Sequence, residues 1–236
     1  MSPAQIFKTT MTTFVEKIIG PRTPEKNLAE DRNRYLLPTI FFLLAVALLV
    51  ASVFFPYWKM TLQAPQYPKG LSVQAYIFKL TGDVREIDGL NHYIGMRPLA
   101  EAAQLERSLS IAGVIVLSFL IIGSIFIHTK YTVLLVLPAI LYPFIFLGDM
   151  YFWLRNFGLN LDPTAPLSAS IKPFVPPVLG VGKLAQFVTI TQVQFGFYLA
   201  LAAAISIIIG LYFHRRAYKP LVEAQAELDT QATEQD

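Results

Sequence analysis

The residues best suited to bind a metal ion lie in the stretch Asn91-His92-Tyr93-Ile94-Gly95-Met96. His92 offers an imidazole and Met96 a thioether four residues later, and both ligand types suit Cu(I). Met60 precedes them in the same segment, and Met150 lies near the end of a later apolar stretch, so either could assist. Alternatively, His92 forms a hydrogen bond in a turn and Met96 packs against lipid or protein. The pattern indicates a copper site at His92, Met96 and Met60, with a structural role as the alternative.

A second candidate is Asp149, the only acidic residue within the long apolar stretches. Carboxylates inside a membrane are costly to bury and are usually functional. Asp149 therefore indicates a proton pathway or a quinone-linked site. It lies near the end of its stretch, where water or Arg155 could lower the cost of its charge. A hydrogen bond in a structural network is the alternative.

Other chemistry is excluded by composition. The chain has no cysteine and three histidines, which rules out disulfides, iron–sulfur clusters and thiolate-bound zinc or copper. It has no Ser-His-acid arrangement, phosphate-binding glycine loop or metalloprotease motif. The net charge is only +3 and forms no basic stripe, so we do not expect nucleic-acid binding. We expect no independent enzymatic activity and no cofactor apart from the copper considered above.

Four apolar stretches must position these residues: Leu36–Phe55, Leu109–Ile127, Tyr131–Trp153 and Val193–Phe213. Each is close to the roughly 20 residues with which a helix crosses a bilayer. In lipid, a segment must satisfy its own backbone hydrogen bonds, so these stretches are helices. The composition agrees, because 54% of the residues are hydrophobic and only 15% are charged. The sequence predicts an all-α membrane protein with a four-helix domain over residues 36–213.

Basic residues indicate how this domain is oriented. They flank three helix ends that share one side if all four helices cross: Arg32, Arg34, Lys130, Arg215 and Arg216. The positive-inside rule assigns that side to the cytoplasm. We therefore expect cytoplasmic N- and C-termini. Segments 56–108 and 154–192 become outer loops.

The two ends of the chain form the expected cytoplasmic parts. Residues 1–35 form an arm and linker, with apolar residues such as Phe7, Met11 and Phe14 at helical spacing. This arm lies on the membrane or on a partner, unless it is a loosely ordered leader. Residues 214–236 form a tail, rich in Ala, Gln and Glu, that extends the last helix.

Both outer loops show signs of order. In the first, alternation over Leu71–Phe78, a turn at Thr81-Gly82-Asp83 and a second strand at Val84–Ile87 predict a small β-hairpin. In the second, prolines favour extended backbone, and apolar residues there predict a docking surface for a partner. The residues concerned are Phe174, Val175, Pro176 and Pro177. A re-entrant or interfacial segment is the alternative.

Small residues mark two helix faces, with Gly113 and Gly123 in the second stretch and Ala203 and Gly210 in the fourth. Small residues let helices approach closely in lipid. These faces pack within the chain or against another subunit.

The outer segments also carry a resemblance. Ala64-Pro65-Gln66-Tyr67-Pro68, Leu90–Met96, Asn160-Leu161-Asp162-Pro163 and Pro176–Gly180 resemble motifs of an uncharacterised family of bacterial polytopic membrane proteins. Its members look as if they accompany electron-transfer and copper-maturation systems, including those around nitrous oxide reductase. The similarity covers most of residues 56–190, and it implies that the chain lies in the inner (cytoplasmic) membrane of a bacterium. Some members have a histidine where this chain has Leu159, which argues against a metal site shared by both loops.

Two functions follow as expectations. The first is an accessory membrane subunit of a bacterial respiratory or photosynthetic electron-transfer complex, such as an alternative complex III-type quinol oxidoreductase. It would brace neighbouring helices and dock redox subunits on the outer side, so its partners would be membrane and periplasmic-side subunits and the lipid bilayer. The alternative is a membrane copper-handling or maturation factor that uses His92 and Met96.

Overall fold

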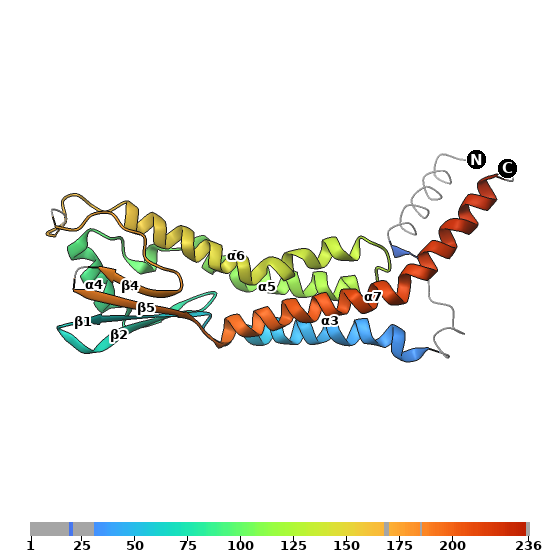
Figure 1. Cartoon of the computed structure of the whole chain (residues 1–236), viewed down its shortest axis with the longest axis horizontal. Coiled ribbons are helices and arrows are strands. Elements are labelled where there is room, and N and C mark those ends of the chain that lie inside the picture. The colour runs from blue at the N-terminus through green and yellow to red at the C-terminus, as the bar shows by residue number, and fades with distance from the viewer. Residues whose placement is uncertain (1–18, 21–30, 168–169, 185, 235–236) are drawn as a thin grey trace. The chain divides into compact units, whose positions relative to one another are not determined.

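The computed structural model describes residues 19–20, 31–167, 170–184 and 186–234. Four long helices lie in these ranges: α3 (Arg32–Ser52), α5 (Gln104–Ser124), α6 (Thr132–Leu159) and α7 (Phe195–Glu234) (Figure 1). Each is long and apolar enough to cross a membrane, so the four predicted spans are confirmed as helices. These helices characterise a multi-pass membrane protein. Most of the predicted N-terminal arm lies outside the described residues.

The helices extend beyond their apolar stretches. Helix α6 continues past Trp153 to Leu159, and α7 continues past Phe213 to Glu234, as we expected for the tail. Hydropathy marks only the segment suited to lipid, whereas Ala, Gln and Glu in the tail are good helix formers in water.

The chain divides into two compact units. One combines Met1–Ala47, Val116–Ile140 and Ala202–Asp236, and we call it the helical unit. The other combines Leu48–Ile115 and Leu141–Leu201, and we call it the sheet unit. Each long helix contributes residues to both units.

In the helical unit, α3 and α7 pack closely. The rings of Phe41 and Phe213 stack with centroids 5.7 Å apart, and the Ser206 hydroxyl donates to the Phe41 carbonyl at 2.8 Å. A Cβ atom on Gly210 would lie 2.9 Å from the Phe42 ring, so this glycine allows the close approach. The small residues at this point of α7 therefore pack within the chain.

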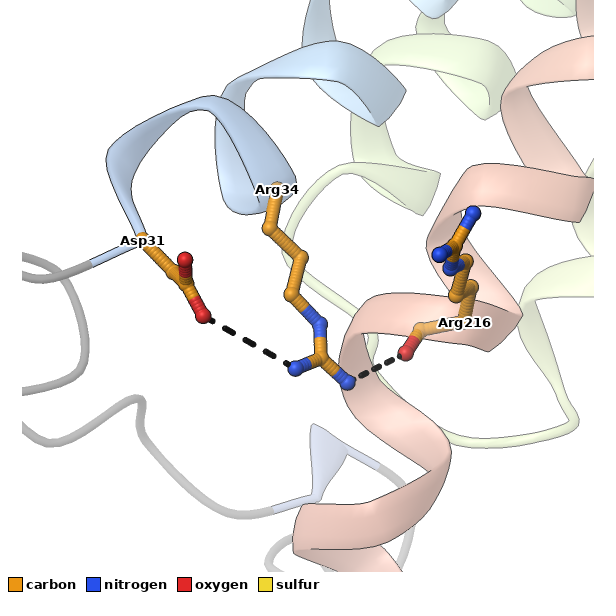
Figure 2. A network of polar contacts seen from close by, with 3 residues as sticks. All are labelled: Asp31, Arg34 and Arg216. Carbon is orange, nitrogen blue, oxygen red and sulfur yellow. Dashed lines mark hydrogen bonds and ion pairs between the residues drawn. The ribbon is translucent and has the colours of Figure 1, made fainter.

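A polar contact joins the start of α3 to α7. The Arg34 guanidinium lies 4.0 Å from the Asp31 carboxylate and donates to the Arg216 carbonyl at 2.8 Å (Figure 2). In a regular helix this carbonyl would accept from the backbone of residue 220, but Pro220 has no N–H group. Arg34 therefore supplies the hydrogen bond that Pro220 removes. Both charged side chains are exposed, so the ion pair itself adds at most about 1 kcal/mol.

The sheet unit contains a five-stranded antiparallel sheet of order β3-β2-β1-β5-β4. Its strands are β1 (Trp58–Ala64), β2 (Tyr67–Ala75), β3 (Leu80–Gly82), β4 (Gly180–Leu184) and β5 (Phe187–Val193) (Figure 1). Strand β1 pairs with β5 in a continuous register from Trp58↔Val193 to Gln63↔Val188. Both predicted outer loops thus contribute strands to one sheet.

This sheet corrects the all-α prediction, which is wrong for this unit. Residues Trp58–Ala64 alternate between buried and less buried positions, as a half-buried strand does. Trp58 directly follows the first apolar stretch, where tryptophan is typical of an interface anchor, and this context concealed the alternation. The partner strand β5 lies more than a hundred residues later, and pairing over such a distance leaves no local signal.

The predicted hairpin is right in its first strand and wrong in its second. Strand β2 covers part of the predicted Leu71–Phe78, but residues from Val84 onwards form helix α4 (Val84–Ile94). The buried residues of α4 are Ile87, Asn91 and Ile94, which recur at helical spacing. Four residues were too few to distinguish this period from that of a strand.

The core of the sheet unit lies between the sheet, α4 and α6. Every second residue of β1 and of the end of β2 is buried and faces Ile87 of α4 and Leu154 of α6. These strand residues are Trp58, Met60, Leu62, Leu71, Val73 and Ala75. The short 3-10 helix η1 (Leu99–Glu101) contributes Leu99 to the edge of this core.

Candidate functional site

The first candidate site is a cavity of about 260 Å³ in the sheet unit, which we call the Asp149 pocket. Strands β1 and β2, the start of α5 and one face of α6 form its walls. Apolar side chains such as Trp58, Met60 and Phe146 make up most of the lining. The sequence singled out Asp149, and the fold adds an apolar chamber beside it.

The polar groups of the Asp149 pocket lie on two helices, with Glu106, Arg107 and Ser110 on α5 and Asp149 and Trp153 on α6. Asp149 and Trp153 are one helical turn apart and both line the cavity. The buried Trp153 indole N–H lies near enough to the carboxylate to interact with it, yet among the described residues no acceptor meets it with hydrogen-bond geometry. A buried donor without a partner costs about 1–3 kcal/mol, so this N–H favours a ligand oxygen.

No arginine neutralises Asp149 in the described part of the chain. The only ion pairs found there are Arg34–Asp31 and Lys219–Glu223, so the suggested Asp149–Arg155 pair does not form. Arg107 lines the pocket, but its guanidinium donates to the carbonyls of Ala100 and Ala103 at 2.5 and 3.3 Å. The pocket therefore holds two carboxylates, Asp149 and Glu106, that have no ion-pair partner among the described residues, and the N–H of Trp153 beside Asp149.

A chain of hydroxyl groups reaches the wall of this pocket. Ser52 Oγ donates to the Leu49 carbonyl at 2.5 Å, so the Tyr57 hydroxyl, 2.7 Å away, must donate to Ser52. Tyr57 in turn hydrogen-bonds with the hydroxyl of Tyr142, which lines the pocket. Burial raises the pKa of Tyr57, so it stays protonated at neutral pH. These groups fix the orientation of Tyr142.

A second cavity, of about 350 Å³, lies on the other side of Met60, and we call it the Met96 pocket. Met60 and Met96 both line it, together with Asn91 of α4. Asn91 is only 8% exposed, and among the described residues its side-chain NH₂ has no acceptor. This cavity therefore combines two thioethers with one unpartnered amide.

His92 is not among the residues that line the Met96 pocket. It is exposed, and its ring meets that of Tyr93 edge-on at 6.2 Å. Helix α4 ends at Gly95, which adopts the left-handed conformation with φ 79°, so Met96 no longer follows the helical path. The spacing of four residues therefore does not bring His92 and Met96 onto one face. Two of the three predicted metal ligands share a cavity, and the third faces outward.

Two of the four motifs that carry the resemblance, Leu90–Met96 and Asn160–Pro163, meet at Gly95. The Asp162 N–H donates to the Gly95 carbonyl at 2.8 Å, and a Cβ atom on Gly95 would lie 2.6 Å from the Asp162 carbonyl oxygen. Hydrogen bonds from the Thr164 hydroxyl and backbone lower the pKa of Asp162. The turn at Asp162 lies so close to residue 95 that only a glycine fits at that position.

The predicted docking segment packs mostly against its own unit. Phe174 donates its N–H to the Gly158 carbonyl at 3.0 Å, and Pro177 lies against Gly182, where a Cβ would be 2.7 Å from the proline ring. Phe174, Val175, Pro176 and Pro177 all line the Met96 pocket. Of these four, only Val175 is exposed.

Sequence reasoning missed several of these residues. Trp153 ends the third apolar stretch and was not singled out, although its position one turn after Asp149 was a usable signal. Asn91 was hidden inside the motif around His92. The contact of Tyr57 with Ser52 was not predictable, because it depends on the turn between α3 and β1.

In the described part of the chain, no three His, Asp or Glu side chains come close enough together to hold a metal ion. No known protein family matches the sequence, and no curated protein is significantly similar to it.

Proposed function

We propose that this chain is an accessory membrane subunit of a bacterial respiratory or photosynthetic electron-transfer complex, of the kind represented by an alternative complex III-type quinol oxidoreductase. In this proposal its termini are cytoplasmic and its sheet lies on the outer side of the inner membrane. There the sheet docks a redox subunit of the complex, while the helices brace their neighbours.

An exposed apolar patch outside the candidate spans carries the docking part of the proposal. Val181 of β4 and Ile190 of β5 are cross-strand partners, so they share one face, and they are 63% and 36% exposed. Leu179 and Val175 are also exposed close by along the chain. Strand β4 ends the sheet, and unpaired sheet edges beside apolar residues favour partner strands.

Affinity purification from native membranes tests this docking surface. Val181→Lys places a charge in the patch, and we expect it to release the partner subunits. The matched control is Leu167→Lys, since Leu167 is another exposed apolar residue of the same loop. If both variants retain the same subunits as the wild-type chain, the patch is not the docking surface.

The Asp149 pocket supports a quinone-linked role within such a complex. A quinone has a flat apolar ring and carbonyl oxygens, which match an apolar chamber with one free N–H donor at Trp153. Asp149, one turn away, would accept or return the proton that quinol chemistry requires. We expect Asp149→Asn to slow turnover of the host complex, whereas unchanged turnover would leave Asp149 with a structural role.

Copper handling is the second candidate function. It is favoured by one observation, that Met60 and Met96 line the same cavity. Copper content should fall in a Met60→Leu, Met96→Leu variant, which preserves side-chain volume, and His92→Ala tests whether the exposed imidazole takes part. Equal copper content in the wild type and in all variants would end this candidate.

A further inference from the structure

A third cavity, of about 910 Å³, lies in the helical unit, between the connection from α5 to α6 and the middle of α7. One part of its lining carries three cationic side chains, those of Lys130, Arg215 and Lys219. Such a volume exceeds what a single small anion needs and suits a larger ligand. We call this cavity the basic pocket.

The basic pocket carries an excess of positive charge. Glu223 is the only acidic residue among its described lining residues, and it pairs with Lys219 at 3.4 Å. Lys130 and Arg215 are exposed and face no carboxylate of the described lining. An arginine and a lysine together suit a phosphate group, which accepts several charge-assisted hydrogen bonds.

A hydrogen bond and a ring contact join the connection before Lys130 to α7. His214 is buried, and its Nε2 donates to the Ile127 carbonyl at 2.9 Å. The ring of His128 stacks on that of Tyr218 with centroids 4.0 Å apart and only 4° between their planes. These contacts hold Ile127 and His128 against α7, so the backbone before Lys130 stays close to the part of α7 that carries Arg215.

The remaining wall is apolar and belongs to the membrane spans. Val133 at the start of α6 and Ile208 of α7 line the pocket and are exposed large apolar residues. Tyr131 and Tyr212, exposed in the same lining, are typical of the membrane–water interface. The cavity thus changes from apolar to basic, in the order in which a phospholipid presents its acyl chains and its phosphate.

We propose that the basic pocket binds an anionic phospholipid, with the phosphodiester at Lys130 and Arg215 and an acyl chain along Val133 and Ile208. Basic pockets between transmembrane helices bind such headgroups in other membrane proteins. A free phosphate would use the same two cations but would gain nothing from the apolar wall. The proposal is independent of the electron-transfer function, because none of these residues belongs to the sheet unit.

Native mass spectrometry of the full chain in detergent, after incubation with phosphatidylglycerol or phosphatidylcholine, tests the proposal. We expect preferential retention of phosphatidylglycerol, and about a 25-fold loss of that retention in Lys130→Gln, Arg215→Gln, since each cation near an anionic headgroup contributes about fivefold. The control Lys69→Gln, Arg97→Gln removes the same charge from exposed residues of the sheet unit and should change nothing.

A charge-preserving variant, Lys130→Arg, Arg215→Lys, should retain the lipid and excludes a folding defect at these positions. Equal retention by the wild type and the glutamine variant would overturn the proposal. It would also be overturned if excess inorganic phosphate displaced the lipid fully, because the site would then recognise phosphate without its acyl chains.

Discussion

At the scale of single residues, two close contacts exist because a neighbouring residue lacks an N–H group or a side chain. Pro220 has no N–H, and Arg34 fills the gap at the Arg216 carbonyl. The Asp162 backbone comes so close to Gly95 that a side chain there would collide with it. By contrast, the N–H of Trp153 and the amide of Asn91 have no partner among the described residues. A buried donor without a partner beside a cavity is therefore the first group to test for ligand binding.

The contact of Arg34 with Arg216 predicts a dependence on Pro220. Arg34→Met should lower the free energy of unfolding by about 1 kcal/mol, because it removes a hydrogen bond but keeps much of the aliphatic stem. In a Pro220→Ala background the helix regains its own N–H donor, so the same change should cost much less. Unfolding in mixed micelles measures both values, with Arg32→Met as the control. An equal loss of unfolding free energy in both backgrounds would contradict the idea that Arg34 replaces the hydrogen bond missing at Pro220.

Trp153→Phe tests the Asp149 pocket, because it keeps an aromatic ring and removes only the N–H donor. We expect binding of a quinone analogue by the purified protein to weaken about tenfold, as for the loss of one buried hydrogen bond. Tyr151→Phe, on an exposed part of the same helix, is the control and should leave binding unchanged. Fluorescence titration measures these affinities. An unaltered affinity in Trp153→Phe would contradict a role of this N–H in binding.

At the scale of elements, sequence reasoning predicted what is local and missed what is not. The four helices follow from runs of apolar residues that only lipid explains, and part of β2 followed from alternation. The pairing of β1 with β5 joins segments that are separated in sequence by the two long helices α5 and α6 and by several shorter elements, so no pattern within either strand predicts it. Asp149 was found because a carboxylate in an apolar stretch is conspicuous, whereas the chamber beside it depends on this long-range pairing.

The absence of cysteine permits a direct test of that pairing. Lys59 and Gln192 are register partners in β1 and β5, so a Lys59→Cys, Gln192→Cys variant should form a disulfide on mild oxidation. In the control Lys59→Cys, Val188→Cys the second cysteine lies on the same face but four residues along β5, about 13 Å away. Protease cleavage between the two sites followed by gel electrophoresis detects the link. Linking of both pairs to the same extent would argue against the register.

At the scale of the whole molecule, the proposals assign different tasks to the two units. The sheet unit holds the apolar patch, the Asp149 pocket and the Met96 pocket, which together suit a partner and a small ligand. The helical unit holds the basic pocket, which suits lipid. The predicted orientation, with the basic residues in the cytoplasm and the sheet outside, stays a prediction.

That orientation can be tested with single cysteines in the cysteine-free chain. We predict that a membrane-impermeant maleimide labels Lys69→Cys in β2 on intact spheroplasts, and labels Glu227→Cys near the end of α7 only after the membrane is permeabilised. Both positions are exposed, so a difference in labelling reports sidedness. The reverse pattern would place the termini outside.

The most direct test of the central claim is a reduced-minus-oxidised absorption spectrum of material purified from native bacterial membranes through a tag on this chain. The chain has no cysteine, and we predict no haem site in it, so a redox signal must come from partners. The account predicts a stable complex with a clear haem or iron–sulfur signal, which is absent from the chain purified alone. A single monodisperse 26.4 kDa species without any redox signal in mild detergent would contradict it.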